Sequence, residues 1–346
     1  MTWEWQDLYN KYKNLVGSAT AQQIERKNNE AWRSFFALIH LKTQGQLPSH
    51  ITRVSPPGYW KDRRSNMRKL IIIIRCDSYR FDNQMLHLPK RLDVKWKGKP
   101  KWVGWTKQGR LIIKYDAITG KWYARQPVEV EPPHQPLSNR RAYIDLGVIN
   151  LLTIAVDGER QTFAYSGRSA LADWWYLSHR INHLKSLAKR MNNRESTLEV
   201  RRLFRLRRLR LRQYVNTIVR CAIENVWTHG VSKLVMGDLT GILTNGNSGR
   251  KAKTMTHNFW SHRFLMQRVI AVAEEYGISV ELVDERGTSS TCPRCGSRRI
   301  GHRGRLFKCL ECGLEAHRDT VGTVNIGVVF GGRVNGVMAH PVEVCA

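Results

Sequence analysis

Two pairs of cysteines near the C-terminal end place the strongest constraint on how this chain can fold. They are Cys292 and Cys295, and then Cys309 and Cys312 after a gap of thirteen residues. Two Cys-X-X-Cys turns at this spacing are typical of a zinc ribbon, in which four thiolates bind one structural Zn²⁺ ion. So short a ribbon has no core of its own, and the metal supplies most of its stability. We therefore expect it as an insert, over residues 288–316, in a larger domain.

Two disulfides or four free thiols are the alternative interpretations of these cysteines. Disulfides are disfavoured because nothing in the sequence indicates export, and the first residues do not resemble a signal peptide. No stretch approaches the ~20 apolar residues that span a bilayer. We therefore expect a protein of the reducing cytoplasm that has no membrane partner.

The balance of charge indicates which partners such a chain can have. The sequence contains 57 Lys and Arg against 28 Asp and Glu, which gives a net charge of +29. An excess of this size repels itself in the folded state unless a polyanion neutralises it. Nucleic acid is the natural partner, since each contact to a phosphate releases counterions. A basic membrane-surface protein and a ribosomal-type protein are the alternatives.

The N-terminal part of the chain contains two regions of different pattern. Apolar residues recur at helical spacing from the start, and we expect a helical segment over residues 1–66. Residues 67–135 instead show short apolar runs separated by turns, with Gly98, Gly109 and Gly120 at regular intervals. Regular short strands with glycine turns predict a small β-barrel. Its expected strands are Leu70–Ile74, Met85–Leu88, Trp102–Trp105, Leu111–Tyr115 and Trp122–Ala124.

A basic and aromatic stretch lies inside the expected barrel. Its lysines, which are interspersed with tryptophans, are Lys95, Lys97, Lys99 and Lys101. Bases stack on aromatic rings while cations contact phosphates, so this composition suits binding of single-stranded or irregular RNA. The alternative, that the tryptophans belong to the core, we expect to hold for about half of them.

Residues 136–346, which follow a proline-rich linker, begin with an acidic residue inside an apolar strand. Two apolar strands joined through Gly147 are expected here, and Asp145 lies in the first. A carboxylate in a buried strand is costly unless it is paired or binds a metal. This position therefore predicts a functional acid rather than a structural one.

A long helical section is expected over residues 167–230, and the charges in its middle are almost all arginine. Leu203, Leu206 and Leu209 keep an apolar stripe at helical spacing. A helix that is merely solvated would mix both signs of charge, whereas this one predicts contact with a nucleic-acid backbone. The predicted nucleic-acid-binding residues of this helix are Arg201, Arg202, Arg205, Arg207, Arg208, Arg210 and Arg212.

The remaining elements are expected in the order strand, helix, strand, metal insert and helix, and the last helix contains Asp319. Together with the strands around Asp145 they fit a ribonuclease-H-like α/β nuclease domain. The chain as a whole is therefore predicted to be an α+β multidomain protein. It comprises a helical segment, a small β-barrel, and this nuclease domain with its inserted zinc ribbon.

Several motifs lie within residues 140–327. They are Ile144-Asp145-Leu-Gly-Val, Asp238-Leu-Thr-Gly-Ile, Thr288-Ser-Ser-Thr-Cys-Pro-Arg-Cys-Gly296, and Arg318-Asp319 followed by Gly322 and Asn325-Ile326. These motifs resemble those of the TnpB family, the RNA-guided nucleases of insertion sequences that are regarded as ancestral to type V CRISPR effectors. Their order along the chain is that of the RuvC domain and zinc ribbon of the family. Residues 10–60 and 69–135 resemble, more weakly, the helical recognition domain and the wedge barrel.

The resemblance implies a RuvC active site that hydrolyses phosphodiester bonds. Its ligands to two Mg²⁺ ions would be Asp145, Glu285 and Asp319. The family usually has a glutamate where this chain has Gly237, and Glu285 matches a rearranged position that occurs in parts of the family. The neighbouring Asp238 would point away from the metals, because adjacent residues on a strand face opposite ways.

A second departure follows the last aspartate, where the asparagine of the family is replaced by Val321. This change leaves the metal ligand Asp319 in place. It therefore weakens the motif without removing the implied site.

The function that the resemblance implies is RNA-guided DNA cleavage for an insertion sequence, in a prokaryotic cytoplasm and on the nucleoid when DNA is bound. A guide RNA made from the transposon end would pair with one strand of double-stranded DNA beside a short adjacent motif. A nuclease-inactive RNA-guided repressor is one alternative, in which Gly237 marks the loss of chemistry. A small type V CRISPR effector and a zinc-ribbon module without a guide are the others.

Overall fold

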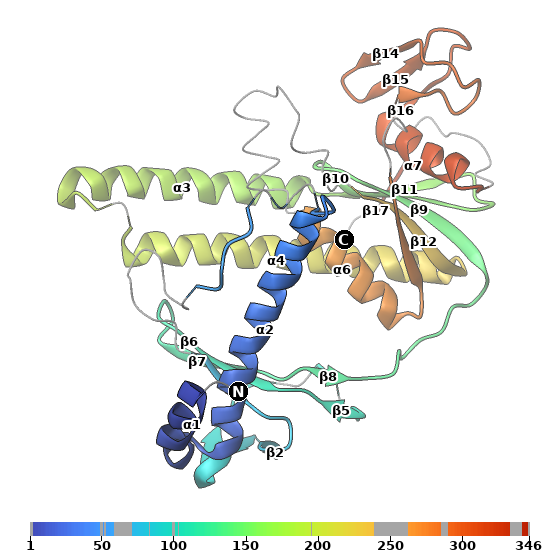
Figure 1. Ribbon diagram of the computed structural model, residues 1–346. Helices are drawn as coiled ribbons and strands as arrows, with labels where there is room; N and C mark the ends of the chain where they lie inside the picture. Colours follow the sequence, from blue (N-terminus) through green and yellow to red (C-terminus); the bar gives the residue numbers. More distant parts are fainter. Residues whose placement is uncertain are drawn as a thin grey trace. The chain divides into compact units, whose positions relative to one another are not determined.

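The computed structural model describes residues 3–48, 51, 53–58, 71–82, 84–98, 101–102, 104–194, 196–238, 262–284, 290–332 and 341–344. Glu285 and Lys99 lie outside these residues. The chain divides into two compact units, Met1–Glu131 and Pro132–Ala346, and each contains both helices and strands (Figure 1). Over the residues described, no helix combines the length and the apolar character that a bilayer span requires.

The first unit begins with two helices, as the helical spacing predicts. These are α1 (Trp3–Val16) and α2 (Ser18–Thr43). Gly17 separates them with a φ of 86°, a left-handed conformation that glycine adopts without steric cost. An ion pair of 2.7 Å between Glu30 Oε1 and Arg110 Nη2 joins α2 to the strands that follow.

The described strands of the first unit form three small antiparallel sheets. Their orders are β1-β6-β7, β2-β3-β4 and β5-β8. Tyr79, Leu86 and Leu111 are among the residues of one shared apolar core. The strands are β1 (Ile71–Ile74), β2 (Arg80–Asp82), β3 (Met85–Leu88), β4 (Leu92–Lys95), β5 (Lys107–Gln108), β6 (Leu111–Asp116), β7 (Lys121–Arg125) and β8 (Val128–Glu129), with a 3-10 turn, η1 (Pro89–Arg91), before β4.

The structure bears on two expectations for this unit. Over the described residues its strands form three separate sheets, and their closure into one small barrel stays a prediction. The predicted strand Trp102–Trp105 is wrong, because its described residues are outside any strand. Gly104 there has a φ of 74°, a left-handed turn conformation that interrupts an extended segment.

The second unit is built on a mixed sheet in the order β13-β12-β9-β10-β11-β17. β12 pairs in parallel with both β9 and β13, whereas β9, β10 and β11 are antiparallel. The strands are β9 (Arg140–Leu146), β10 (Asn150–Val156), β11 (Thr162–Ser166), β12 (Val231–Gly237), β13 (Ser279–Val283) and β17 (Val342–Val344). The sequence pattern does not reveal β17, a three-residue strand that pairs in parallel with β11.

Helices cover both faces of this sheet. α4 (Leu198–Thr228) and α6 (His262–Glu275) pack on one face, where Ile144, Leu234 and Met236 belong to the main apolar core. α7 (Arg318–Val329) packs on the other face, where Tyr143, Val235 and Val283 contact Ile326. Because side chains alternate along a strand, Asp145 shares the α7 face with Tyr143.

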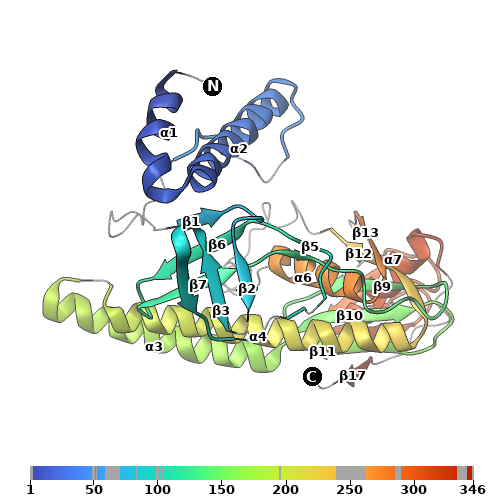
Figure 2. The same ribbon diagram turned by 90° about the horizontal axis from the view of Figure 1, so that it is seen from below.

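Two helices form a long antiparallel hairpin, which confirms the predicted helical section. α3 (Arg168–Asn192) lies side by side with α4 in both views (Figures 1 and 2). α3 ends at Asn193, which has a φ of 48°, and Thr197 caps α4 by accepting a 3.2 Å hydrogen bond from the N–H of Val200. The hairpin extends past the six-stranded sheet of the second unit.

The cysteine-containing insert forms a small three-stranded sheet directly before α7. Its strands are β14 (Ile300–Arg303), β15 (Leu306–Cys309) and β16 (Glu315–His317), in that order. Phe307, Leu314 and Ala316 form its buried core together with Val321 of α7. The valine that replaces the asparagine of the family thus joins the first turn of α7 to the ribbon.

Candidate metal sites

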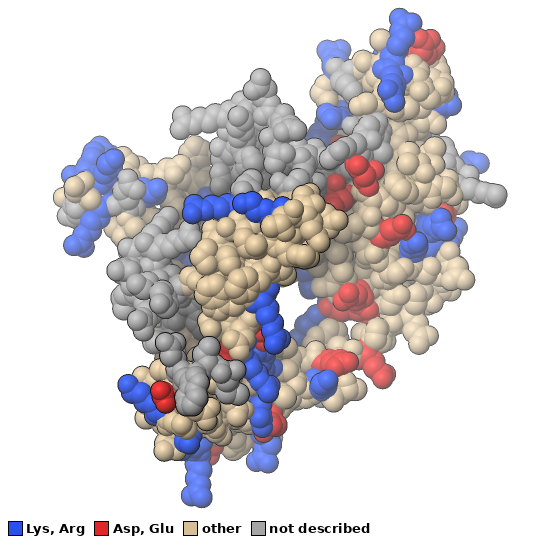
Figure 3. All heavy atoms as spheres, viewed as in Figure 1, with Lys and Arg blue, Asp and Glu red and all other residues tan. Residues whose placement is uncertain are grey.

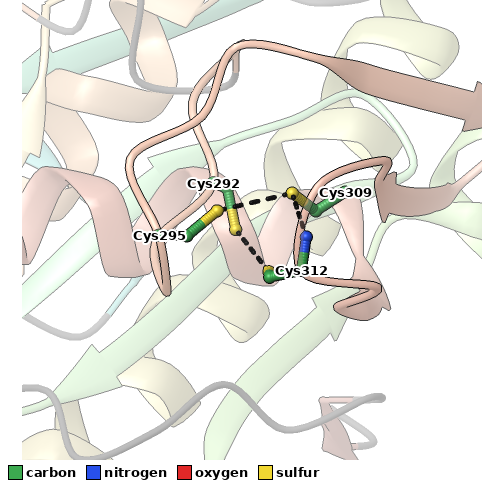
Figure 4. Close-up of side chains that lie close together, drawn as sticks. All are labelled: Cys292, Cys295, Cys309 and Cys312. Atoms are coloured by element: carbon green, nitrogen blue, oxygen red, sulfur yellow. Dashed lines mark hydrogen bonds between the residues drawn. The ribbon is translucent and has the colours of Figure 1, made fainter.

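The four cysteines come together as the zinc prediction requires. Their sulfurs all lie within 4.8 Å of one another, and Cys292–Cys312 and Cys295–Cys309 are each 3.6 Å apart (Figure 4). A tetrahedral Zn²⁺ with bonds of about 2.3 Å separates its sulfur ligands by about 3.8 Å. The cluster therefore fits the ion with little adjustment.

Local backbone geometry prepares these thiols for a cation. The pKa of Cys309 is lowered to about 6, first because the backbone N–H of Cys312 donates to its sulfur. The N–H of Ser297 likewise lowers the pKa of Cys295, but burial and the three neighbouring thiols outweigh it and raise that pKa to about 12. The neighbouring thiols thus oppose deprotonation of Cys295, and binding of Zn²⁺ would favour its thiolate form.

A second candidate site lies where β9 meets the first turn of α7. A Cβ added to Gly322 would stand 3.1 Å from Oδ2 of Asp145, so the carboxylate of Asp145 lies directly against the helix. Asp319 is three residues before Gly322 and therefore on the same side of α7. A strand and a helix thus bring two predicted ligands to one place, and the absent side chain of Gly322 leaves room for them.

The carboxylate of Asp319 is held by two donors that the sequence analysis did not identify. Asn150 Nδ2 donates to Oδ2 at 3.0 Å, and Arg305 Nη1 lies 2.8 Å from Oδ1 and 2.7 Å from Oδ2. Asn150 is a buried polar residue at the start of an apolar strand, which is a signal that sequence reasoning could have used. Arg305 lies in a ribbon turn among other arginines and carries no such signal.

The third carboxylate is the least defined part of this site. Met236 pairs with Ile144, so Gly237 is level with Asp145 on the neighbouring strand and contributes no side chain. Its parallel partner is Val283, and Glu285 follows two residues later, outside the described residues. Within the described ranges, no third cysteine, histidine or carboxylate gathers with Asp145 and Asp319 as a metal-binding group.

Asp238 has surroundings that differ from those of Asp145. Its charge acts on His262 at the start of α6, where burial lowers the pKa of the imidazole and Asp238 opposes this shift. Because α6 covers the face opposite α7, Asp238 is oriented toward the other side of the sheet. This arrangement agrees with the expectation that Asp238 does not replace the missing glutamate.

The seven arginines of α4 that were predicted to bind nucleic acid divide into two groups. Arg207 Nη1 donates to Ser178 at 2.7 Å and its guanidinium stacks 4.9 Å from the ring of Trp174. Arg210 forms a 2.7 Å ion pair with Asp173, and Arg212 lies over a phenylalanine ring of α6. These three side chains therefore hold α4 against α3 and α6.

Of the other predicted arginines, Arg201, Arg202 and Arg205 lie toward the far end of the hairpin, where Figure 3 shows a cluster of basic side chains. Arg201, Arg202 and Arg208 are exposed, and Arg205 is half-buried. The predicted leucine stripe is only partly buried, since Leu206 and Leu209 are 39% and 47% exposed. This end of α4 therefore presents both cations and apolar side chains to a partner.

The basic stretch of the first unit is exposed where it is described. Lys95, Lys97 and Lys101 are exposed, and the Lys101 ammonium lies 4.4 Å from the ring centroid of Trp102. Trp96 instead packs edge-on against Phe81, with ring centroids 5.0 Å apart, and contacts the core of this unit. The tryptophans of the stretch thus have different surroundings: Trp96 packs against the core, whereas Trp102 contacts the exposed Lys101.

Two family models match successive parts of the chain that together cover most of the second unit. A family model described as a probable transposase (OrfB_IS605) matches residues 125–243, and the TNB domain of Cas12f1-like proteins matches residues 262–326. A solved complex of Cas12f1 with sgRNA and target DNA covers 92% of this chain and 73% of that chain, with a TM-score of 0.57 and 13% identity. At this identity the likeness shows a shared mixed α/β fold.

Two relatives have clear sequence similarity. CRISPR-associated endodeoxyribonuclease Cas12f1 of Sulfoacidibacillus thermotolerans is 28% identical over 242 residues, which cover 62% of this chain and 52% of that protein. The TnpB-like protein ORF457 of Acidianus two-tailed virus is 34% identical over 347 residues, which cover 92% of this chain and 74% of that protein. With this identity over most of both sequences, the chain belongs to the TnpB family.

Proposed function

We propose that this protein is an RNA-guided DNA endonuclease of an insertion sequence, with a RuvC-type site formed by Asp145, Asp319 and Glu285. The observation that carries the proposal is the carboxylate of Asp145 lying against Gly322, on the helix face that begins with Asp319. The relatives include a CRISPR-associated endodeoxyribonuclease, and the fold matches that of a Cas12f1 complex with sgRNA and target DNA.

The donor set fits Mg²⁺, which prefers carboxylate oxygens and supplies water activation and leaving-group stabilisation when bound. Asp145 and Asp319 would hold it from a rigid strand and a helix terminus. Asn150 fixes the orientation of the Asp319 carboxylate through its 3.0 Å hydrogen bond. Glu285 would supply the ligand that Gly237 lacks, since it follows the strand whose Val283 pairs with Gly237.

The partners would bind the basic surfaces of both units. We propose that residues 1–66 and 67–135 act as a recognition segment and a wedge-like domain, and residues 136–346 as the nuclease domain. The guide RNA from the transposon end and the double-stranded DNA target would contact the exposed arginines of α4 and the lysines near Trp102. With a net charge of +29, the protein would release many counterions on binding.

Targeted plasmid cleavage tests the proposal directly. Protein co-expressed with RNA from its own locus is incubated with a matching plasmid and Mg²⁺, beside Glu285→Ala and the matched control Glu281→Ala. Glu281 is an acid of β13, four residues before Glu285 in the sequence, and it forms a 2.7 Å surface ion pair with Lys233. We expect Glu285→Ala to lower the cleavage rate by about 100-fold or more, because it removes a metal ligand, and Glu281→Ala to cleave normally.

Three other outcomes have distinct meanings. Tight guide-dependent binding without cleavage by the unsubstituted protein would identify a programmable repressor with an inactive site at Gly237. Full cleavage by Glu285→Ala would place the third ligand elsewhere. A protein that carries no discrete RNA after purification would contradict the guide-dependent function altogether.

The two groups of arginines predict different defects, one in RNA binding and one in stability. Arg208→Glu reverses an exposed charge, so we expect weaker guide-RNA binding. The slope of log K against log salt concentration should be smaller by about 0.7 to 0.9 for each lost phosphate contact. Filter binding at several salt concentrations measures this slope, and unchanged RNA binding by Arg208→Glu would exclude this helix as a contact to the RNA backbone.

Arg207→Ala removes a hydrogen bond to the buried Ser178 and a contact with Trp174. We expect it to lower the free energy of unfolding by about 2 kcal/mol. Thermal unfolding measures this loss.

A further inference from the structure

The ion pair between Arg305 and Asp319 has an unusual geometry. An arginine and a carboxylate usually form two parallel hydrogen bonds that use two nitrogens. Here a single nitrogen, Nη1 of Arg305, lies 2.8 Å from one oxygen and 2.7 Å from the other. It therefore occupies the point between both oxygens, which is where a chelated cation would lie.

The backbone of the ribbon fixes Arg305 at this place. The carbonyl oxygen of Arg305 accepts a 2.9 Å hydrogen bond from the N–H of Arg318, the first residue of α7. Arg305 lies between β14 and β15, directly after Gly304, which has a φ of 63°. The turn is thus anchored next to Asp319, while the guanidinium can rotate away without moving the turn.

The two donors to Asp319 differ in how easily they can leave. The side chain of Arg305 is 41% exposed, so water can solvate its charge after it leaves the carboxylate. Asn150 is 8% exposed, and a released amide would lose its partner without gaining water. A metal ion at Asp319 repels the guanidinium but not the neutral amide. Metal binding would therefore displace Arg305 and leave Asn150 in place.

We propose that Arg305 is a placeholder for the metal ion at Asp319, so that the zinc ribbon occupies the site with its own cation until a metal enters. Asn150 is the positioning residue that orients the carboxylate in both states. The placeholder keeps the carboxylates of Asp145 and Asp319 from repelling each other before metal binds. The inference rests on the proposed function in one respect, that Asp319 is a metal ligand.

Direct measurement of Mn²⁺ binding to the full-length protein without nucleic acid tests this inference. Free Mn²⁺ is followed by electron paramagnetic resonance in the unsubstituted protein, Arg305→Ala, Asn150→Ala and the control Arg303→Ala. Arg303 is an exposed arginine at the end of β14, two residues before Arg305, and its removal changes the net charge equally. We expect Arg305→Ala to bind Mn²⁺ about three- to tenfold more tightly because it loses a competitor. Asn150→Ala should bind it about 10- to 100-fold more weakly.

The opposite signs separate a placeholder from a merely structural contact. A structural Arg305 would give weaker Mn²⁺ binding on removal, like Asn150, and this result or an unchanged affinity would overturn the inference. Arg305→Lys should bind Mn²⁺ nearly as the unsubstituted protein does, because it retains a competing cation. Stabilisation by Mn²⁺ in thermal unfolding should be larger for Arg305→Ala than for Arg303→Ala.

Asp145→Asn distinguishes failure of this inference from failure of the proposed function. Loss of Mn²⁺ binding in Asp145→Asn, together with no gain in Arg305→Ala, would refute the placeholder and leave the proposed metal site standing. Mn²⁺ binding that is insensitive to Asp145→Asn would refute the site itself and the placeholder with it.

Discussion

Asp145→Asn is expected to abolish target cleavage while guide RNA and target DNA remain bound. The substitution keeps the size of the side chain but removes the charge that faces the first turn of α7. Losing one carboxylate ligand costs several kcal/mol of transition-state stabilisation, which corresponds to about 1,000-fold or more in rate. Single-turnover cleavage and a mobility-shift assay, both on the protein–RNA complex, measure the two properties separately.

Two controls make this result specific. Glu315→Gln neutralises an acid of the ribbon that forms a surface ion pair with Lys308, and we expect it to cleave normally. Thermal unfolding of Asp145→Asn should stay close to that of the unsubstituted protein, since a half-buried carboxylate is replaced by its neutral isostere. Cleavage that survives in Asp145→Asn would show that the chemistry occurs elsewhere.

The sequence predicts best where a local pattern determines the structure. Helical spacing predicts α1 to α4, two apolar runs joined through Gly147 predict β9 and β10, and the cysteine spacing predicts the ribbon. Gly104 shows the limit of such patterns, because the run Trp102–Trp105 has strand composition but contains a left-handed turn. β17 is missed for a similar reason, since three residues are too few for a periodic signal.

Contacts between distant residues are what the sequence conceals. The sequence does not distinguish the seven predicted arginines of α4 from one another. In the structure, however, Arg207 donates a hydrogen bond to Ser178 and stacks on Trp174, both of α3. Arg305 is likewise one of several ribbon arginines, and only the fold brings it to Asp319. For the carboxylate site, the family resemblance implies which residues are the ligands. The two side chains that donate to Asp319, Asn150 and Arg305, are found only from the structure.

Removal of zinc is expected to disable the nuclease from a distance. Zinc binding contributes on the order of 10 kcal/mol or more to small cysteine sites, so Cys309→Ser should unfold the ribbon. Val321 of α7 is part of the ribbon core, and His317 of β16 caps α7 by accepting a 3.3 Å hydrogen bond from the N–H of Asp319. Loss of the ribbon therefore loosens the helix turn that carries Asp319, and we expect cleavage to fall by at least about 100-fold.

Metal content and a second cysteine variant check this expectation. The purified protein should contain one zinc per chain, whereas Cys309→Ser should contain much less, and Cys76→Ser, an isolated cysteine of the first unit, should retain it. Because Arg305 and Val321 both depend on the ribbon, Cys309→Ser should also lose the tighter Mn²⁺ binding expected of Arg305→Ala when the two changes are combined. A zinc-free variant with normal cleavage would show that the ribbon serves nucleic-acid contact alone and that α7 holds Asp319 without it.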